Sequence, residues 1–304
     1  MVKQNIPVMG DRTAIRPQDS QADIAIKKRR KRRQFVLNGL LHIILITLGT
    51  SMIIPLLWMV STSLKQPVAV FDFPPQWVPR PIVWENYITA WNSMPFARFY
   101  FNSIFIGVVV TLGQVTTSAM AAYAFARLKF PLRDKLFFGY LATMMIPGSV
   151  TMIPVFILIK MLGLVDTYAA LILPGFFSAY GTFMLRQFFM SIPTELEEAA
   201  KLDGCSFWGI FVNVILPLSK PGLATLVTFT FMGSWGNFTW PMIVTNSEEM
   251  KTLPIGLLSF QGMYNTDWTL LMAGSLIVLV PVIIVFLIGQ RHFVEGIQMG
   301  AIKG

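Results

Sequence analysis

The residues that could do chemistry in this sequence are few, and the densest group lies in the stretch 191–222, which reads SIPTELEEAAKLDGCSFWGIFVNVILPLSKPG. Its carboxylates are Glu195, Glu197, Glu198 and Asp203. The chain has one cysteine and two histidines, too few for a His/Cys metal cluster. It also has no G-x-x-x-x-G-K-[ST] phosphate loop and no G-x-S-x-G nucleophile motif. We therefore expect no catalytic residue, no metal site and no cofactor bound by this chain.

The first half of this stretch predicts a short acidic helix. TELE is typical of a capping box, with Thr194 as the N-cap and Glu197 three residues later. We expect Glu197 to pair with Lys201 one turn on. The helix should end at Gly204, because glycine adopts the left-handed conformation that closes many helices.

The second half predicts an apolar helix. Ser206 can act as the N-cap of FWGIFVNVIL, and Pro217 should break the chain after it. The sequence therefore predicts two short helices joined at a glycine hinge, one acidic with small side chains and one apolar.

The elements that position this helix pair have a membrane composition. Of the 304 residues 54% are hydrophobic and 13% are charged, whereas a soluble domain has about 25% charged residues. Six uncharged runs are long enough to cross a bilayer as helices. They are 34–64, 99–126, 136–159, 167–185, 221–247 and 268–290. We predict an all-α polytopic membrane protein with six transmembrane helices and a cytoplasmic helix pair.

The distribution of Lys and Arg predicts the orientation. With a cytoplasmic amino terminus, nineteen of the 24 basic residues fall on the inner side, as the positive-inside rule requires. Both termini should then be cytoplasmic. The expected domains are a disordered basic cytoplasmic tail 1–33, a six-helix domain 34–290 with the loop 191–220, and a cytoplasmic tail 291–304.

Two further segments bear on partners. The run KKRRKRR, 27–33, resembles a nucleic-acid patch, but directly before a span we interpret it as a contact with anionic lipid headgroups, and we expect no nucleic-acid partner. The outer segment 246–267 is polar and long enough to reach another protein. The spans lack interior charged residues, which proton- or ion-coupled carriers commonly need, although sodium-coupled carriers can use backbone carbonyls instead. Energy for uphill transport would then enter from outside the bilayer.

The spacing in the acidic stretch resembles a known signature. EAAKLDG, nine residues and then VILP match the EAA-x₃-G-x₉-I-x-LP pattern of the membrane subunits of ABC importers, with Val214 where the pattern usually has Ile. The matching positions are Glu198, Ala199, Ala200, Asp203, Gly204, Val214, Leu216 and Pro217. SLKQP, GLVDTYAALILP and QRHFVEGIQMGAIKG extend the likeness to the maltose-type, MalG-like permeases of the carbohydrate-uptake branch.

This resemblance implies a transport subunit without its own ATPase site, located in a bacterial or archaeal cell membrane. A second permease subunit would complete the pore as a heterodimer. Two cytoplasmic ABC ATPase subunits would use ATP and Mg, and an extracytoplasmic binding protein would deliver a sugar or oligosaccharide. The EAA helices would seat in the ATPase. The C-terminal tail, with Gly296, Gly300 and Gly304, would reach between the two ATPases.

The substrate path and the solute are less closely defined. FMGSWGNFTWP in the fifth predicted span offers Trp235, Asn237 and Trp240 as stacking faces and an amide for a neutral, hydroxyl-rich solute. The alternative is that these aromatics pack against lipid or the partner subunit. A glycerol phosphodiester or a polyamine is the alternative solute. A secondary carrier or a channel would share the six spans but has no use for an EAA signature.

Overall fold

The computed structural model describes residues 21–262 and 265–301, and all regular elements in these ranges are helical. One isolated antiparallel bridge joins Gln261 and Thr266. The all-α prediction is confirmed. The chain forms two compact units, residues 1–58 and 59–304.

The first unit consists mainly of helix α1, Gln21–Ser63, whose last turn belongs to the second unit. The prediction of a disordered tail over residues 1–33 is therefore wrong from residue 21 onward. Lys, Arg and Ala favour helix, and each residue added to an existing helix gains a hydrogen bond, so the apolar helix extends into the basic run. Residues 1–20 lie outside the described residues.

The second unit contains three further stretches that are long and apolar enough to span a membrane. They are α3 (Phe96–Arg127), the segment Tyr168–Met190 made of α6 (Tyr168–Ile172), η3 (Leu173–Phe176) and α7 (Ala179–Met190), and the part of α14 (Trp268–Ala301) up to Gln290. Together with Arg29–Ser63 these make four candidate spans, or up to six if two bent helix pairs each count as one. The candidate span Trp268–Gln290 has the bounds of the predicted span 268–290, and α14 continues beyond it to Ala301.

The predicted span 136–159 is not one straight helix. The structure has α4 (Arg133–Ala142), η2 (Thr143–Met145) and α5 (Gly148–Met161), with a bend of 98° between the two halves. Ile146 is extended, with φ −84° and ψ 118°. The cause is Pro147, because a proline disfavours the helical conformation of the residue before it.

The predicted span 221–247 is also interrupted. Helix α11 (Lys220–Trp235) ends at Gly236, and the separate helix α12 covers Thr239–Val244. Gly236 and Asn237 between them are poor helix formers. The second bent pair joins Phe207–Leu218 to α11 at an angle of 79°.

The remaining short helices lie in the loops. They are η1 (Pro67–Ala69), α2 (Glu85–Asn92), α8 (Glu195–Leu202), α9 (Phe207–Ile210), the π-helix η4 (Phe211–Ile215), α10 (Leu216–Leu218), η5 (Glu248–Met250), α13 (Leu253–Gly256) and η6 (Leu257–Phe260). The segment after α12 folds back onto α3: the Asn102 amide donates to the carbonyls of Glu249 and Lys251, and Ser103 Oγ accepts from the Leu253 amide.

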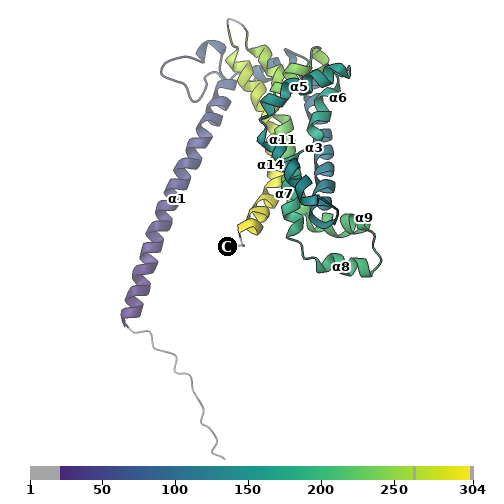
Figure 1. Cartoon of the computed structure of the whole chain (residues 1–304). Coiled ribbons are helices and arrows are strands. Elements are labelled where there is room, and N and C mark those ends of the chain that lie inside the picture. The colour runs from purple at the N-terminus through teal and green to yellow at the C-terminus, as the bar shows by residue number, and fades with distance from the viewer. Residues whose placement is uncertain (1–20, 263–264, 302–304) are drawn as a thin grey trace, which may run out of the picture. The chain divides into compact units, whose positions relative to one another are not determined.

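Helix α3 packs against α7 and α11, and α11 packs against α14. Small side chains allow the close approach of α3 and α7, as is common between membrane helices. A Cβ on Gly181 of α7 would lie 2.7 Å from Ser118 Oγ of α3. Figure 1 shows α8 and α9 at one end of this bundle and α5 and α6 at the other end. The acidic stretch thus lies at one end of α3 and the segment after α12 contacts the opposite part of the same helix.

Candidate functional site

The acidic helix α8 ends as predicted. Gly204 has φ +81°, the left-handed region. The Cys205 amide donates to Ala200 O (2.9 Å) and the Gly204 amide donates to Lys201 O (3.0 Å). These two hydrogen bonds form a Schellman motif, which satisfies the carbonyl groups at the helix end.

The capping box predicted at the start of α8 is wrong. Thr194 has helical dihedral angles and its side chain makes no capping hydrogen bond. Glu197 does not reach back to it and does not pair with Lys201. Its Oε1 lies 2.8 Å from Arg127 Nε, and both side chains are only 7% exposed. The ammonium of Lys201 lies 5.9 Å from the centre of the Phe207 ring instead. A buried long-range ion pair has replaced the local contacts.

Arg127 is a residue that the sequence analysis missed. It is the last residue of α3. Besides its pair with Glu197, its Nη2 donates to the carbonyls of Phe189, in the last turn of α7, and of Ile192, just after that helix. One guanidinium therefore joins the ends of α3 and α7 to α8. The available signal was its place as the first charged residue after the apolar run 99–126.

The second helix begins as predicted, because Ser206 Oγ accepts from the Gly209 amide at 3.1 Å. The predicted break at Pro217 is wrong. The helix passes through Pro217 to Leu218, and the chain bends at Ser219. A π-helix precedes the proline, with the Leu216 amide bonded to Phe211 O five residues back. This wider turn accommodates the ring that would clash in a regular α-helix.

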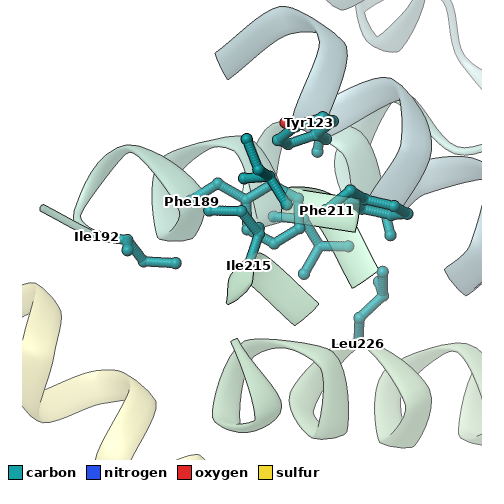
Figure 2. Close-up of a cluster of buried hydrophobic side chains, with 10 residues drawn as sticks. Tyr123, Phe189, Ile192, Phe211, Ile215 and Leu226 are labelled. Atoms are coloured by element: carbon teal, nitrogen blue, oxygen red, sulfur yellow. The ribbon is translucent and has the colours of Figure 1, made fainter. Parts of the chain in front are cut away.

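A hydrophobic core lies beneath the helix pair (Figure 2). It combines Tyr123 of α3, Phe189 of α7 and Phe211 and Ile215 of η4, while Leu226 reaches it from α11. The Tyr123 hydroxyl donates to Phe207 O at 3.2 Å. The motif residues Ala200, Val214 and Leu216 pack against this core. They therefore hold the pair in place from its inner side.

The outer side of the pair is an exposed surface of acidic and apolar groups. Of the motif residues in and directly after α8, Glu198, Ala199, Asp203 and Gly204 are exposed. Beside them Leu202 is 90% exposed, Phe207 62% and Trp208 61%. The sequence analysis did not single out these three apolar side chains. Exposed carboxylates next to exposed large apolar groups, at the end of a bundle, are typical of a surface that contacts another protein.

A second feature is a cavity of about 360 Å³ between α3, η3, α11 and α12. It is lined by Val110, Gln114, Leu171, Pro174, Gly175, Phe229, Thr230, Gly233, Ser234, Asn237 and Trp240. None of these side chains is charged. Gln114 Nε2 donates to Thr230 Oγ1 at 2.9 Å, and the indole of Trp240 donates to Ala170 O at 2.9 Å.

The structure brings together two of the three residues predicted for a substrate path. Asn237 and Trp240 line the cavity, but Trp235 does not. Trp235 is only 3% exposed, stacks on Phe231 and donates from its indole to Val278 O at 3.1 Å. A tryptophan with its N–H bonded inside the bundle is a core residue.

The sequence analysis missed the polar cavity residues Gln114, Thr230 and Ser234. Their signal was the spacing of Thr230, Ser234 and Asn237, which places uncharged polar groups along one side of an apolar segment. Of the predicted C-terminal contacts, Gly296 and Gly300 belong to α14, and Gly304 lies outside the described residues.

This chain is similar in sequence to permease proteins of known transport systems. The arabinooligosaccharides transport system permease protein AraQ of Bacillus subtilis is 37% identical over 74% of this chain and 81% of its own length. The sn-glycerol-3-phosphate transport system permease protein UgpE of Yersinia enterocolitica is 35% identical over 84% of this chain and 94% of its own length.

A solved structure extends the likeness to the fold. In the crystal structure of a bacterial ABC transporter that imports the acidic polysaccharide alginate, one chain is 26% identical, with a TM-score of 0.76 over 91% of this chain and 99% of that one. The family model of the binding-protein-dependent transport system inner membrane component matches residues 114–298, which include the helix pair and most of the cavity. This chain belongs to the family of binding-protein-dependent transport system inner membrane components.

Proposed function

We propose that this chain forms half of the pore of an ATP-driven importer for a neutral, hydroxyl-rich solute, a sugar or an oligosaccharide. The observation that carries the choice of solute is the cavity, whose lining is uncharged but holds Gln114, Thr230 and Asn237. Amide and hydroxyl groups can exchange hydrogen bonds with sugar hydroxyls. The face of Trp240 offers the amphipathic surface that sugar rings pack against.

The proposed assembly follows from membership of the family. A second permease subunit completes the pore, and a binding protein delivers the solute from outside. Two ATPase subunits in the cytoplasm bind ATP and Mg²⁺, so this chain is not itself an enzyme. In this arrangement the chain crosses the cell membrane six times, with α4–α5 as one bent span and α11–α12 as another, and both termini are cytoplasmic.

The proposed contact with an ATPase is the exposed part of α8 and α9 that contains Glu198, Ala199, Leu202, Asp203 and Trp208. Glu198 and Asp203 offer carboxylates to basic groups of the partner, and Ala199 allows its close approach. Leu202 and Trp208 supply apolar area, which contributes most of the free energy of protein association. Gly204 sets the angle between the two helices.

A second candidate solute is a glycerol phosphate or an acidic sugar, because UgpE is named for glycerol-3-phosphate and the alginate importer takes an acidic polysaccharide. A phosphate or carboxylate group is usually bound by Arg or Lys. None of the residues that line the cavity is basic, and this favours the neutral solute.

Calorimetry of the binding protein that functions with this permease tests the class of solute. The panel contains neutral oligosaccharides, an acidic oligosaccharide, glycerol 3-phosphate and a polyamine. We expect binding of a neutral sugar, and uptake of that sugar by cells should fall when Asn237 is replaced by leucine. Tight binding of only a charged ligand would contradict the proposal.

A further inference from the structure

We infer that α3 transmits movement of the α8–α9 pair to the cavity, and that Arg127 and Glu197 are the positioning residues that join α3 to the pair. This inference rests on the proposed function, in which α8 and α9 contact an ATPase. It adds a specific path inside this chain: from α8 through one buried ion pair, along one helix, to the side chains that line the cavity.

The C-terminal end of α3 contacts both helices of the pair. Arg127 and Tyr123 lie four residues apart, so they share one side of α3. Arg127 is paired with Glu197 of α8 at 2.8 Å, and Tyr123 donates to the Phe207 carbonyl at the start of α9. Because each helix of the pair has its own attachment, neither can shift without moving or breaking its contact with α3.

The middle part of α3, N-terminal to these contacts, lines the cavity. Val110 and Gln114 are on its wall, and Gln114 donates to Thr230 of α11. From Gln114 to Arg127 the helix is unbroken and contains no proline. At 1.5 Å per residue the two ends of this segment are about 20 Å apart. A continuous helix of this length, packed against α7, moves as a rigid element.

The Arg127–Glu197 ion pair is better suited to positioning α8 on α3 than to stabilising the fold. Both charged side chains of the pair are 7% exposed, and the cost of desolvating two charges offsets much of their attraction. What such a pair provides is a fixed geometry. The guanidinium is planar and contacts Glu197 of α8 and two carbonyl groups at the end of α7 at once, so it fixes the position of Glu197 relative to α3 and α7.

The test uses the complete importer in proteoliposomes, with both permease subunits, the ATPases and the sugar-loaded binding protein. The measured quantity is the stimulation ratio, the rate of ATP hydrolysis with the loaded binding protein divided by the rate without it. Glu197→Gln keeps the size of the side chain and removes its charge. We expect the ATPase to remain bound at the wild-type level while the stimulation ratio falls about tenfold.

Three further variants sharpen the test. Arg127→Lys should lower the ratio similarly, and the double variant with Glu197→Gln should fall no further, because both changes break the same contact. Tyr123→Phe removes one hydroxyl and keeps the ring against Phe211. Tyr123→Phe should lower the ratio about twofold. If the ion-pair variants fail to fold, the ratio of this variant tests the inference in their place. Glu195→Gln makes the same charge change at an exposed position of α8 and should leave the ratio unchanged.

The outcomes separate this inference from its alternatives. A purely structural role would reduce the amount of folded complex and leave the ratio unchanged, and that result would overturn the inference. It would also be overturned if Glu197→Gln gave a folded permease pair without bound ATPase, because the ion pair would then only shape the contact surface. A different result would contradict the proposed function: Glu198→Lys and Gly204→Val would both retain the ATPase and full uptake.

Discussion

The carboxylate of Asp166 accepts hydrogen bonds from the backbone amides of Asn246 (2.9 Å) and Ser247 (3.1 Å). It thereby joins the loop before α6 to the loop after α12. The Asp166 amide in turn donates to Val244 O at 2.8 Å. The hydrogen bond from Asn246, with those from Ser247, holds the pKa of Asp166 below its ordinary value of 3.8. Two loops at the end of the bundle opposite α8 are thus held together by one charged group.

This contact predicts a pH-dependent stability. The pKa of Asp166 is lower in the folded than in the unfolded protein, so the unfolded state binds more protons between the two values. The stabilisation is fully present above about pH 5 and is lost as the pH falls through the folded pKa. Asp166→Asn removes it. We expect the variant to have a lower free energy of unfolding at pH 7, and the difference should shrink towards about pH 3.

Thermal unfolding of the purified permease in detergent, followed across this pH range, measures the difference. Asparagine is the suitable replacement because Asp166 has φ +63°, a conformation that Asn also tolerates. Curves for the two proteins that stay parallel at all pH values would show that the charge of Asp166 contributes nothing.

Trp235 and Asn237 should respond to substitution in opposite ways. Trp235→Ala removes a buried aromatic side chain and leaves Val278 O without its donor, so it should cost about 3–5 kcal/mol of stability and lower the amount of protein in the membrane. Asn237→Ala loses a long hydrogen bond to the Trp240 amide and should cost about 1 kcal/mol or less.

The measurements are membrane levels by immunoblot and sugar uptake per molecule of permease. Asn237→Ala should reach near-normal levels and transport less, whereas Trp235→Ala should be scarce in the membrane. A scarce Asn237 variant with normal uptake per molecule would remove Asn237 from the substrate path.

Local rules predicted the junction between α8 and α9 correctly. Gly204 and Ser206 act through contacts within a few residues, so their roles can be read from the sequence. Glu197 shows where such rules stop. A capping box and an i,i+4 pair were both available to it, yet it pairs with Arg127, 70 residues away. Burial decided the outcome, because a carboxylate taken out of water needs a full positive charge beside it.

Hydropathy located the apolar segments but not their breaks. Ile146 and Pro147 lie inside a run whose apolar content predicts a continuous span, and the bend there depends on one proline. Trp235 and Trp240 could not be distinguished by residue type either. Their side chains face different neighbours only because the helix ends at Gly236 between them.

We expect the segment between α12 and α14, which the proposed topology places outside the cell, to contact the docked binding protein. Its first part is attached to α3 through Asn102 and Ser103, so the test changes the part after η6. Replacing residues 261–265 with a Gly/Ser linker should leave assembly intact and abolish the stimulation of ATP hydrolysis by the loaded binding protein. Basal hydrolysis of the same preparation is the control. Unchanged stimulation would show that this segment is not required.

Gly204→Val tests the hinge. A Cβ at Gly204 would have no heavy atom of this chain within 4 Å, so any effect on the fold of this chain comes from the backbone. Its φ of +81° should cost a non-glycine residue about 1–2 kcal/mol. We expect normal insertion and pairing with the second permease, but weaker attachment of the ATPase in a pull-down. Gly204→Asn, which tolerates this conformation better, is the control and should lose less.

Glu198→Lys tests the acidic surface of α8 without changing its backbone. Glu198 is exposed, so the substitution should leave the fold intact, apart from about 0.3–1 kcal/mol for a positive charge in the first turn of a helix. Glu195→Lys carries the same helix-end cost at a neighbouring exposed position and serves as the matched control. We expect Glu198→Lys to lose ATPase from the purified complex and sugar uptake from cells, because a lysine would face basic groups of the partner. Equal behaviour of the two variants would mean that Glu198 makes no specific contact with the ATPase.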